Sequence, residues 1–271
     1  MTRLMTVLWL AASVAVSALE AKDSGCTVAD FKGVFGITVT GTVLPGLPIS
    51  GVFGRLGRVV ADGAGNTSVT SLADYNGFGG PNSPTTATVQ EDFAGVYQVR
   101  DDCYLTWQAT LPTGNLAIRF EGVIASDGNE VTLFVADPPG AVLVGSLKRG
   151  KESACTAADF KGSFALQLSG TVVPGLPISG PFGRIGQVVA DGAGAAAATT
   201  IASYTGAVLR ENFDGPYSVS ADCHVTWQTQ LPPPVSLPIL IEGTILAGGS
   251  EVSIMITNPP GSVILGSLKK Q

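Results

Sequence analysis

The residue types that most often perform catalysis are scarce in this 271-residue chain. It has one histidine, His224, so a Ser-His-Asp or Cys-His apparatus would depend on a single imidazole. No C-x-x-C pair, H-E-x-x-H sequence, phosphate-binding glycine loop or Rossmann fingerprint is present. We therefore expect no metal and no cofactor, and any chemistry would have to come from binding and orienting a substrate.

Charge and composition exclude other classes of function. The chain carries 15 Lys and Arg against 21 Asp and Glu, a net charge of -6, so it lacks the clustered positive field that a nucleic-acid partner requires. With 45% hydrophobic and 13% charged residues it has the composition of a folded protein rather than a disordered one. The 35 glycines and 17 prolines indicate many tight turns and short strands.

The N-terminus has the pattern of a secretory signal peptide. A short positive start is followed by an apolar run and by small residues at Val16-Ser17-Ala18, which predicts a signal peptide at 1–18. An uncleaved anchor is the alternative, but the apolar run is short for a membrane span. We expect a mature chain without a membrane span that folds in the secretory pathway, either secreted or in an oxidising lumen.

The chain contains a duplication. The segment that begins at Cys26 returns at Cys155, 129 residues later, and Pro45-Gly-Leu-Pro-Ile-Ser-Gly51 returns at Pro174. The offset falls to 120 between Glu91 and Glu211 and becomes 121 between Glu121 and Glu242. Two copies of this size fit ordinary domains. The predicted domains are 22–149 and 153–271, joined by a short polar linker.

The cysteines support this division. Cys26 and Cys103 in copy one occupy the places of Cys155 and Cys223 in copy two. Four cysteines allow three connectivities, and the repeat favours one disulfide within each copy. On the chain-entropy estimate each bond would contribute roughly 4 kcal/mol.

Each copy has the alternation of β-strands. In Tyr104–Thr110 the apolar side chains Leu105, Trp107 and Ala109 face one way and the polar ones the other. Seven or eight such runs per copy, separated by turns such as Asp62-Gly63, predict an all-β protein with two tandem antiparallel β-barrels. An immunoglobulin-like sandwich is less favoured, because each Trp follows the second Cys on the same strand rather than lying between the two.

A recurring frame of short motifs supports a resemblance. Both copies carry Asp-Phe-x-Gly, Asp-Gly-x-Gly, Phe-x-Gly-x-Tyr (93–97 and 213–217) and Asp-Cys. This frame resembles secreted allene oxide cyclase barrel-like domains, and the tandem form is similar to fungal hetero-Diels-Alderases of tropolone sesquiterpenoid pathways. The resemblance implies calycin-like barrels and a cofactor-free enzyme that joins a reactive quinone methide to a terpene alkene. The resemblance does not identify catalytic residues in this chain.

A pericyclic reaction needs orientation and a hydrogen bond to the electron-poor partner rather than a nucleophile. The candidate donors are Arg58, Tyr104 and His224, positions at which the copies differ, and Tyr104 and His224 lie opposite the Trp face. They would serve a substrate held between the barrels. The candidate substrate-binding residues, which are core residues in the simpler interpretation, are Phe93, Tyr97, Trp107, Phe120, Phe213, Tyr217 and Trp227.

Other features have two interpretations. Arg55 and Arg184 could bind an acidic group or hold a strand end, and the repeat favours the second role. Glu121 and Glu242 are expected to face solvent. The segment 76–90, shortened to 205–210 in copy two, is expected to be a lid over a barrel mouth or a solvent loop. Asn66-Thr-Ser68 is an N-glycosylation sequon.

Two alternatives to catalysis remain at this point. A lipocalin-like carrier of small apolar ligands would have the same fold and pocket without turnover. A secreted structural or interaction protein would have barrels filled by side chains and no cavity of ligand size. The oligomeric state does not follow from the sequence.

Overall fold

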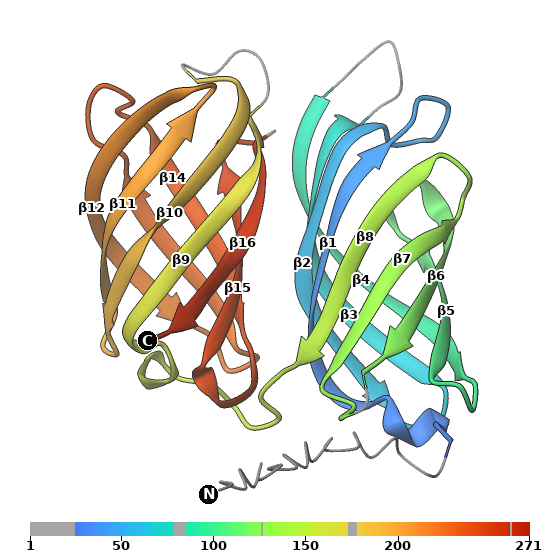
Figure 1. The fold of residues 1–271 in the computed structure, drawn as a ribbon. Coiled ribbons are helices and arrows are strands. Elements are labelled where there is room, and N and C mark those ends of the chain that lie inside the picture. The colour runs from blue at the N-terminus through green and yellow to red at the C-terminus, as the bar shows by residue number, and fades with distance from the viewer. Residues whose placement is uncertain (1–24, 79–84, 126, 173–177, 261) are drawn as a thin grey trace, which may run out of the picture.

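The computed structural model describes residues 25–78, 85–125, 127–172, 178–260 and 262–271. The signal peptide predicted at 1–18 lies outside these residues. The described chain forms two closed antiparallel barrels of eight strands each, which stand side by side (Figure 1). The predicted fold class is confirmed.

Barrel 1 closes by pairing of its first and last strands, Lys32–Val43 with Ala141–Arg149. Its strands are β1 (Lys32–Val43), β2 (Gly51–Asp62), β3 (Asn66–Phe78), β4 (Thr85–Val99), β5 (Tyr104–Leu111), β6 (Leu116–Ile124), β7 (Glu130–Asp137) and β8 (Ala141–Arg149).

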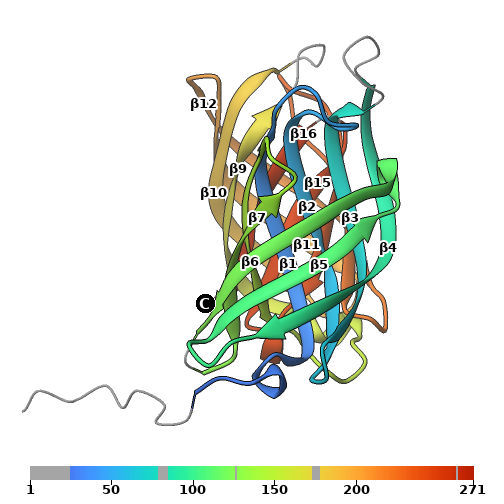
Figure 2. The ribbon, with the colours of Figure 1, turned by 90° about the vertical axis from the view of Figure 1, so that its right-hand side faces the viewer.

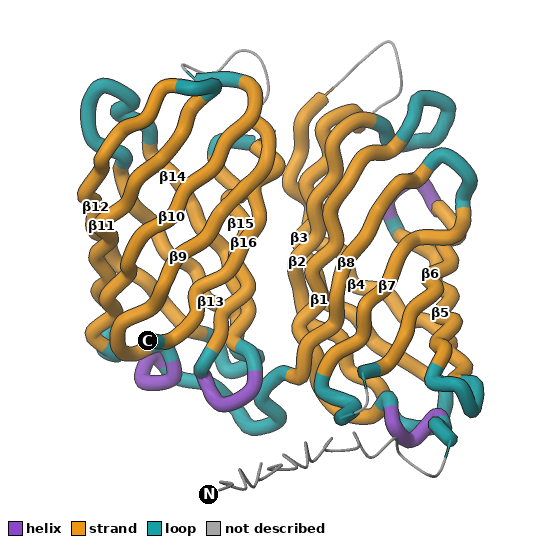
Figure 3. The backbone as a smooth tube through the Cα atoms, in the orientation of Figure 1, coloured by secondary structure: helices purple, strands orange, loops and turns teal. Residues whose placement is uncertain are grey.

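Barrel 2 repeats this order, with β9 paired to both β10 and β16. Its strands are β9 (Lys161–Val172), β10 (Gly180–Asp191), β11 (Ala195–Tyr204), β12 (Ala207–Val219), β13 (His224–Gln230), β14 (Pro238–Ile245), β15 (Glu251–Asn258) and β16 (Ser262–Lys270). Helix is confined to four three-residue 3₁₀ turns in the described chain (Figure 3).

The alternation of side chains decides which face of each strand is inside. In β5, Leu105, Trp107 and Ala109 are buried, whereas Gln108 and Thr110 are exposed. Asp62 makes the β2–β3 turn that the Asp-Gly sequence predicts, because its carboxylate accepts hydrogen bonds from the amides of Ala64 (2.7 Å) and Asn66 (2.9 Å). A hydrogen bond from the Asn66 side chain, together with these two backbone bonds, lowers the pKa of Asp62 to about 2.

The disulfides pair within each copy, as the repeat predicts. Cys26 bonds to Cys103 and Cys155 to Cys223, each with Cα atoms 4.9 Å apart. Each bond ties the segment before the first strand to the turn before the fifth. Disulfides of this kind are typical of chains that fold in an oxidising compartment.

The segment 76–90 is largely strand, so the expected lid or loop is wrong for most of it. β3 extends to Phe78 and β4 begins at Thr85, and these two residues pair across the hairpin. Only 79–84 fall outside the described residues. Both strands of this β-hairpin, β3 and β4, are therefore longer than their counterparts in copy two, Ala195–Tyr204 and Ala207–Val219.

Candidate functional site

The barrel interiors are filled by the aromatic side chains that the sequence offers as substrate-binding residues. Trp107 is fully buried, stacks on Phe120 at 4.6 Å between ring centroids and donates a hydrogen bond from Nε1 to Thr67 Oγ1 at 2.9 Å. The hydroxyl of Tyr97 donates to the carbonyl of Phe31 at 2.7 Å. The other five predicted residues also belong to, or pack against, the two barrel cores: Phe93, Phe120, Phe213, Tyr217 and Trp227.

The space inside each barrel is small. A cavity of about 20 Å³ lies beside Phe53 and Phe120 in barrel 1, and another of about 20 Å³ lies beside Phe182 and Tyr204 in barrel 2. Such a volume holds about one water molecule. Neither cavity admits a terpene, so a site for an organic ligand has to be sought outside the barrel cores.

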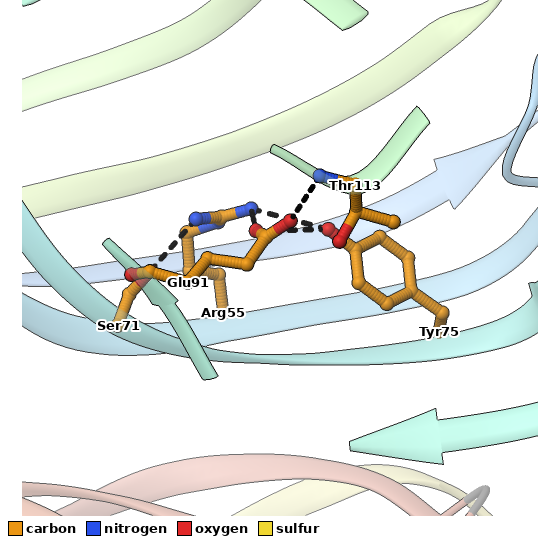
Figure 4. A network of polar contacts seen from close by, with 5 residues as sticks. All are labelled: Arg55, Ser71, Tyr75, Glu91 and Thr113. Carbon is orange, nitrogen blue, oxygen red and sulfur yellow. Dashed lines mark hydrogen bonds and ion pairs between the residues drawn. The ribbon is translucent and has the colours of Figure 1, made fainter. Parts of the chain in front are cut away.

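Arg55 and Arg184 are interior residues with a structural role. In barrel 1 the Arg55 guanidinium forms an ion pair with Glu91 and donates to Ser71 Oγ at 2.7 Å, and the Tyr75 hydroxyl donates to Glu91 at 3.0 Å (Figure 4). Burial raises the pKa of Tyr75, which keeps its hydroxyl protonated as a donor. Barrel 2 repeats the arrangement with Arg184, Glu211 and Tyr204.

The two barrels contact each other through the outer faces of their sheets. Leu56 of β2 packs with Met255, Val263 and Leu265 of β15 and β16 in a small apolar cluster that joins the barrels. At Gly54 a Cβ atom would come within 2.6 Å of Leu265 Cδ1, so the absence of a side chain there permits the close approach. Figure 2 shows barrel 1 in front of barrel 2 along this contact.

We expect Gly54→Ala to weaken the barrel contact, because the added methyl group overlaps Leu265 and Val263 in a packed interface. Gly183 is the matched control, since it holds the equivalent place in barrel 2 and a Cβ there meets nothing within 4 Å. Both changes restrict the unfolded chain alike, so the difference between them isolates the overlap. Denaturant unfolding should show Gly54→Ala less stable than Gly183→Ala by about 1–3 kcal/mol. Equal stability would contradict this account of the interface.

A cleft of about 320 Å³ opens beside this cluster, between the barrels. Barrel 1 contributes Leu56, Arg58 and Leu72, and barrel 2 contributes His224 and Glu242. Two of the three predicted donors, Arg58 and His224, therefore line the same cleft from opposite barrels. For His224, a place between the barrels is the arrangement that its position opposite the Trp face predicts.

The polar groups of this cleft differ in their partners. Nε of Arg58 is buried and has no hydrogen-bond partner among the described residues. His224 Nε2 lies 2.6 Å from Glu242 Oε2, and the same oxygen accepts from Thr226 Oγ1 at 2.9 Å. Glu242 and Glu121 are both buried, so the expectation that they face solvent is wrong. The carboxylate holds the imidazole ring, whereas Arg58 has an unused donor.

Tyr104, the third predicted donor, lies away from the cleft. It occupies the place of His224 in the outer face of barrel 1, where the Arg100 guanidinium stacks over its ring at 5.1 Å from the centroid. The glycosylation candidate Asn66 is exposed at the start of β3, and its Nδ2 donates to Asp62 Oδ2 at 2.7 Å.

A second cavity of about 870 Å³ adjoins the cleft and shares Leu72 and Glu242 with it. Thr88 of barrel 1 lines this cavity, and its Oγ1 atom lies 3.1 Å from the carbonyl oxygen of Thr257 in barrel 2. The Thr88 hydroxyl also hydrogen-bonds to Asp74, a carboxyl group buried between the barrels whose Oδ2 has no partner among the described residues. Asp74 and Thr88 were not among the predicted site residues. Their differences from the counterparts Ser203 and Val208 were the available signal.

Burial raises the pKa of Asp74 from its ordinary value of 3.8 to about 7. Between these values the unfolded chain has lost the proton and the folded chain keeps it, so stability falls as pH rises through this window. This fall in the free energy of unfolding amounts to about 4 kcal/mol, at about 1.4 kcal/mol per pKa unit. We expect Asp74→Asn to abolish it, because asparagine does not titrate. The check is unfolding free energy against pH for both proteins. Parallel curves between pH 4 and 7 would contradict the prediction.

The fold and the cleft define the protein as a tandem pair of closed β-barrels with an open site where the barrels meet. Comparison of the chain with protein-family models found no match, and neither did comparison with curated proteins. None of the helices in the described part of the chain has the length and hydropathy that a membrane crossing requires.

Proposed function

We propose that the protein is a cofactor-independent cyclase of the hetero-Diels-Alderase type. It joins a reactive quinone methide, such as a tropolone-derived one, to a terpene alkene, and the reaction takes place between the barrels. The observation that carries the proposal is the cleft lined by Arg58, Leu56 and Leu72, in which the Nε–H group of Arg58 has no partner among the described residues. The resemblance of the repeated motifs to this group of enzymes supports it.

The cleft fits the demands of such a reaction. As the alkene adds to the quinone methide, negative charge develops on the carbonyl oxygen that becomes the ring ether. A fixed donor at that oxygen stabilises the transition state more than the ground state. Arg58 supplies such a donor, and the ring of His224, held by Glu242, supplies a second polar group across the cleft. The two adjoining cavities fall in the usual size range of ligand sites.

Holding both reactants in this space would remove much of the entropic barrier, since no covalent step by the protein is needed. The small interior cavities do not favour a lipocalin-like carrier that holds its ligand inside a barrel. The carrier therefore remains an outcome of the test rather than a second proposal.

The test is to generate a tropolone quinone methide in the presence of a humulene and the purified protein. We expect faster adduct formation than in buffer and an excess of one stereoisomer, with many turnovers per protein molecule. Saturable binding of the terpene without any change in rate or product ratio would indicate a carrier and overturn the proposal for that pair of reactants.

A further inference from the structure

The two barrels contact each other through two different faces, one on each barrel. Each barrel, being a copy of the other, also carries the face that the other barrel uses, and there that face is not covered. We call the barrel 1 side, which is mainly on β2 and β3 with single residues of β1, β4 and β8, the first face, and the barrel 2 side, on β14 to β16, the second face. Because the barrels are duplicates, barrel 2 has its own copy of the first face, mainly on β10 and β11 with Val208 of β12. Barrel 1 has its own copy of the second face on β6 to β8.

Burial along equivalent strands shows what the contact covers. In β15 all six residues from 252 to 257 are buried, whereas in its counterpart β7 buried residues alternate with exposed ones. Residues 53–57 of β2 are likewise buried without interruption, and the equivalent part of β10 is not. A barrel buries one side of a strand by itself, so the second buried side reflects the partner barrel.

The unused faces expose large apolar side chains at the positions that are buried in the internal contact. In barrel 2, Ile185 is 60% exposed and is the counterpart of Leu56, which is 1% exposed. Val208, 66% exposed, is the counterpart of Thr88. Three residues of barrel 1 are likewise exposed where their counterparts in barrel 2 are buried: Phe134 (47%) against Met255 (0%), Val142 (66%) against Val263 (1%), and Val144 (59%) against Leu265 (8%).

Charge complementarity is also conserved between the used and unused faces. Lys148 of barrel 1 forms an ion pair with Glu251 of barrel 2 at 2.7 Å. The counterparts of these two residues are Lys269 in barrel 2 and Glu130 in barrel 1, and both are exposed. A copy of the internal contact would bring this pair together between two chains.

The sizes of facing residues match as well. In the internal contact Gly36 faces Leu246, whose Cδ2 lies 2.4 Å from the place of a Cβ at Gly36. The counterpart of Gly36 is Ala165 and that of Leu246 is Ala125, both exposed. In a copy of the contact two alanines would therefore face each other where Gly36 faces Leu246.

We propose that the chain associates head to tail with a second copy of itself through these unused faces. The β6–β8 face of barrel 1 in one chain docks on the β10–β11 face of barrel 2 in another, and the contact copies the internal one. Such a heterologous contact closes into a ring or continues as an open chain of molecules. Contiguous exposed apolar residues of this kind are typical of interaction surfaces. The proposal does not depend on the proposed function.

The contact would also build a second cleft between chains. The counterparts of Arg58 and Gln90 are Gln187 and Arg210, so a cation is retained but lies on β12 instead of β10, with β11 between the two strands. The counterpart of His224 is Tyr104, which belongs to barrel 1 of the other chain. Each of these clefts would therefore take residues from two molecules.

The test uses two charge substitutions on exposed positions, Val142→Glu on one unused face and Ile185→Glu on the other. Light scattering after size exclusion should give the unmodified protein a mass of two or more chains and each variant the mass of one. Leu44→Glu, at an exposed residue outside both faces, is the control and should leave the assembly intact. Circular dichroism should show all variants folded.

Mixing the two variants distinguishes head-to-tail contact from other modes. Each retains the face that the other lacks, so the mixture should form a complex of one chain of each and no larger species. A single-chain mass for the unmodified protein at every concentration would overturn the proposal. So would an unchanged assembly in Ile185→Glu, which would mean that the β6–β8 face pairs with itself, or a mixture that stays monomeric.

Discussion

Arg58→Gln should lower the rate of adduct formation about 100-fold, the effect expected when one preorganised donor to a developing oxyanion is removed. Arg58 is the natural target because it lines the cleft and its Nε has no hydrogen-bond partner among the described residues. Glutamine already stands at the counterpart position 187 in barrel 2, and the substitution should leave the fold unchanged. The measurement is the initial rate and the stereoisomer ratio with saturating terpene.

Arg58→Lys separates the geometry of this donor from its charge. Lysine keeps the positive charge but has no Nε–H in the same place and no planar fork. If the directed hydrogen bond matters, Lys should recover only a small part of the lost rate. Full activity in Arg58→Gln, with unchanged stability, would remove Arg58 from the proposed reaction.

The fold could be predicted from local sequence patterns that occur in both copies. Alternation around Trp107 identifies a strand with one buried side, and the matching places of Cys103 and Cys223 identify disulfides within each copy. The Asp62-Gly63 turn follows from backbone preference alone. Features of this kind depend on neighbours along the chain or across one sheet, so a single sequence carries them.

The site could be predicted only in part, because it depends on how two barrels meet. Arg58 and His224 were identified as differences between the copies, but nothing in the sequence says which outer face of a barrel is covered. Leu56 and Ile185 are equivalent and both apolar, yet one is buried and the other exposed. Asp74 was missed for the same reason, since a carboxyl group on an outward position is ordinarily solvated.

Breaking the ion pair inside barrel 2 should be the most damaging single change to stability. Arg184 and Glu211 are 2% and 3% exposed, and Tyr204 donates to Glu211 at 2.8 Å. Glu211→Leu leaves the guanidinium buried with the Tyr204 hydroxyl as its remaining hydrogen-bond partner among the described residues. Removing one partner of a buried pair typically costs about 3–5 kcal/mol. Denaturant unfolding should show this loss.

Replacing the whole group should recover most of that stability. In Arg184→Met/Tyr204→Phe/Glu211→Leu no charge and no hydroxyl remains to be desolvated, and such exchanges are often neutral. The rings of Phe182 and Phe213, which flank the guanidinium at 5.5 Å and 4.9 Å, would pack against the methionine side chain in its place. A triple variant as unstable as Glu211→Leu alone would contradict this account, because the unpaired charge would then not be the cause of the damage.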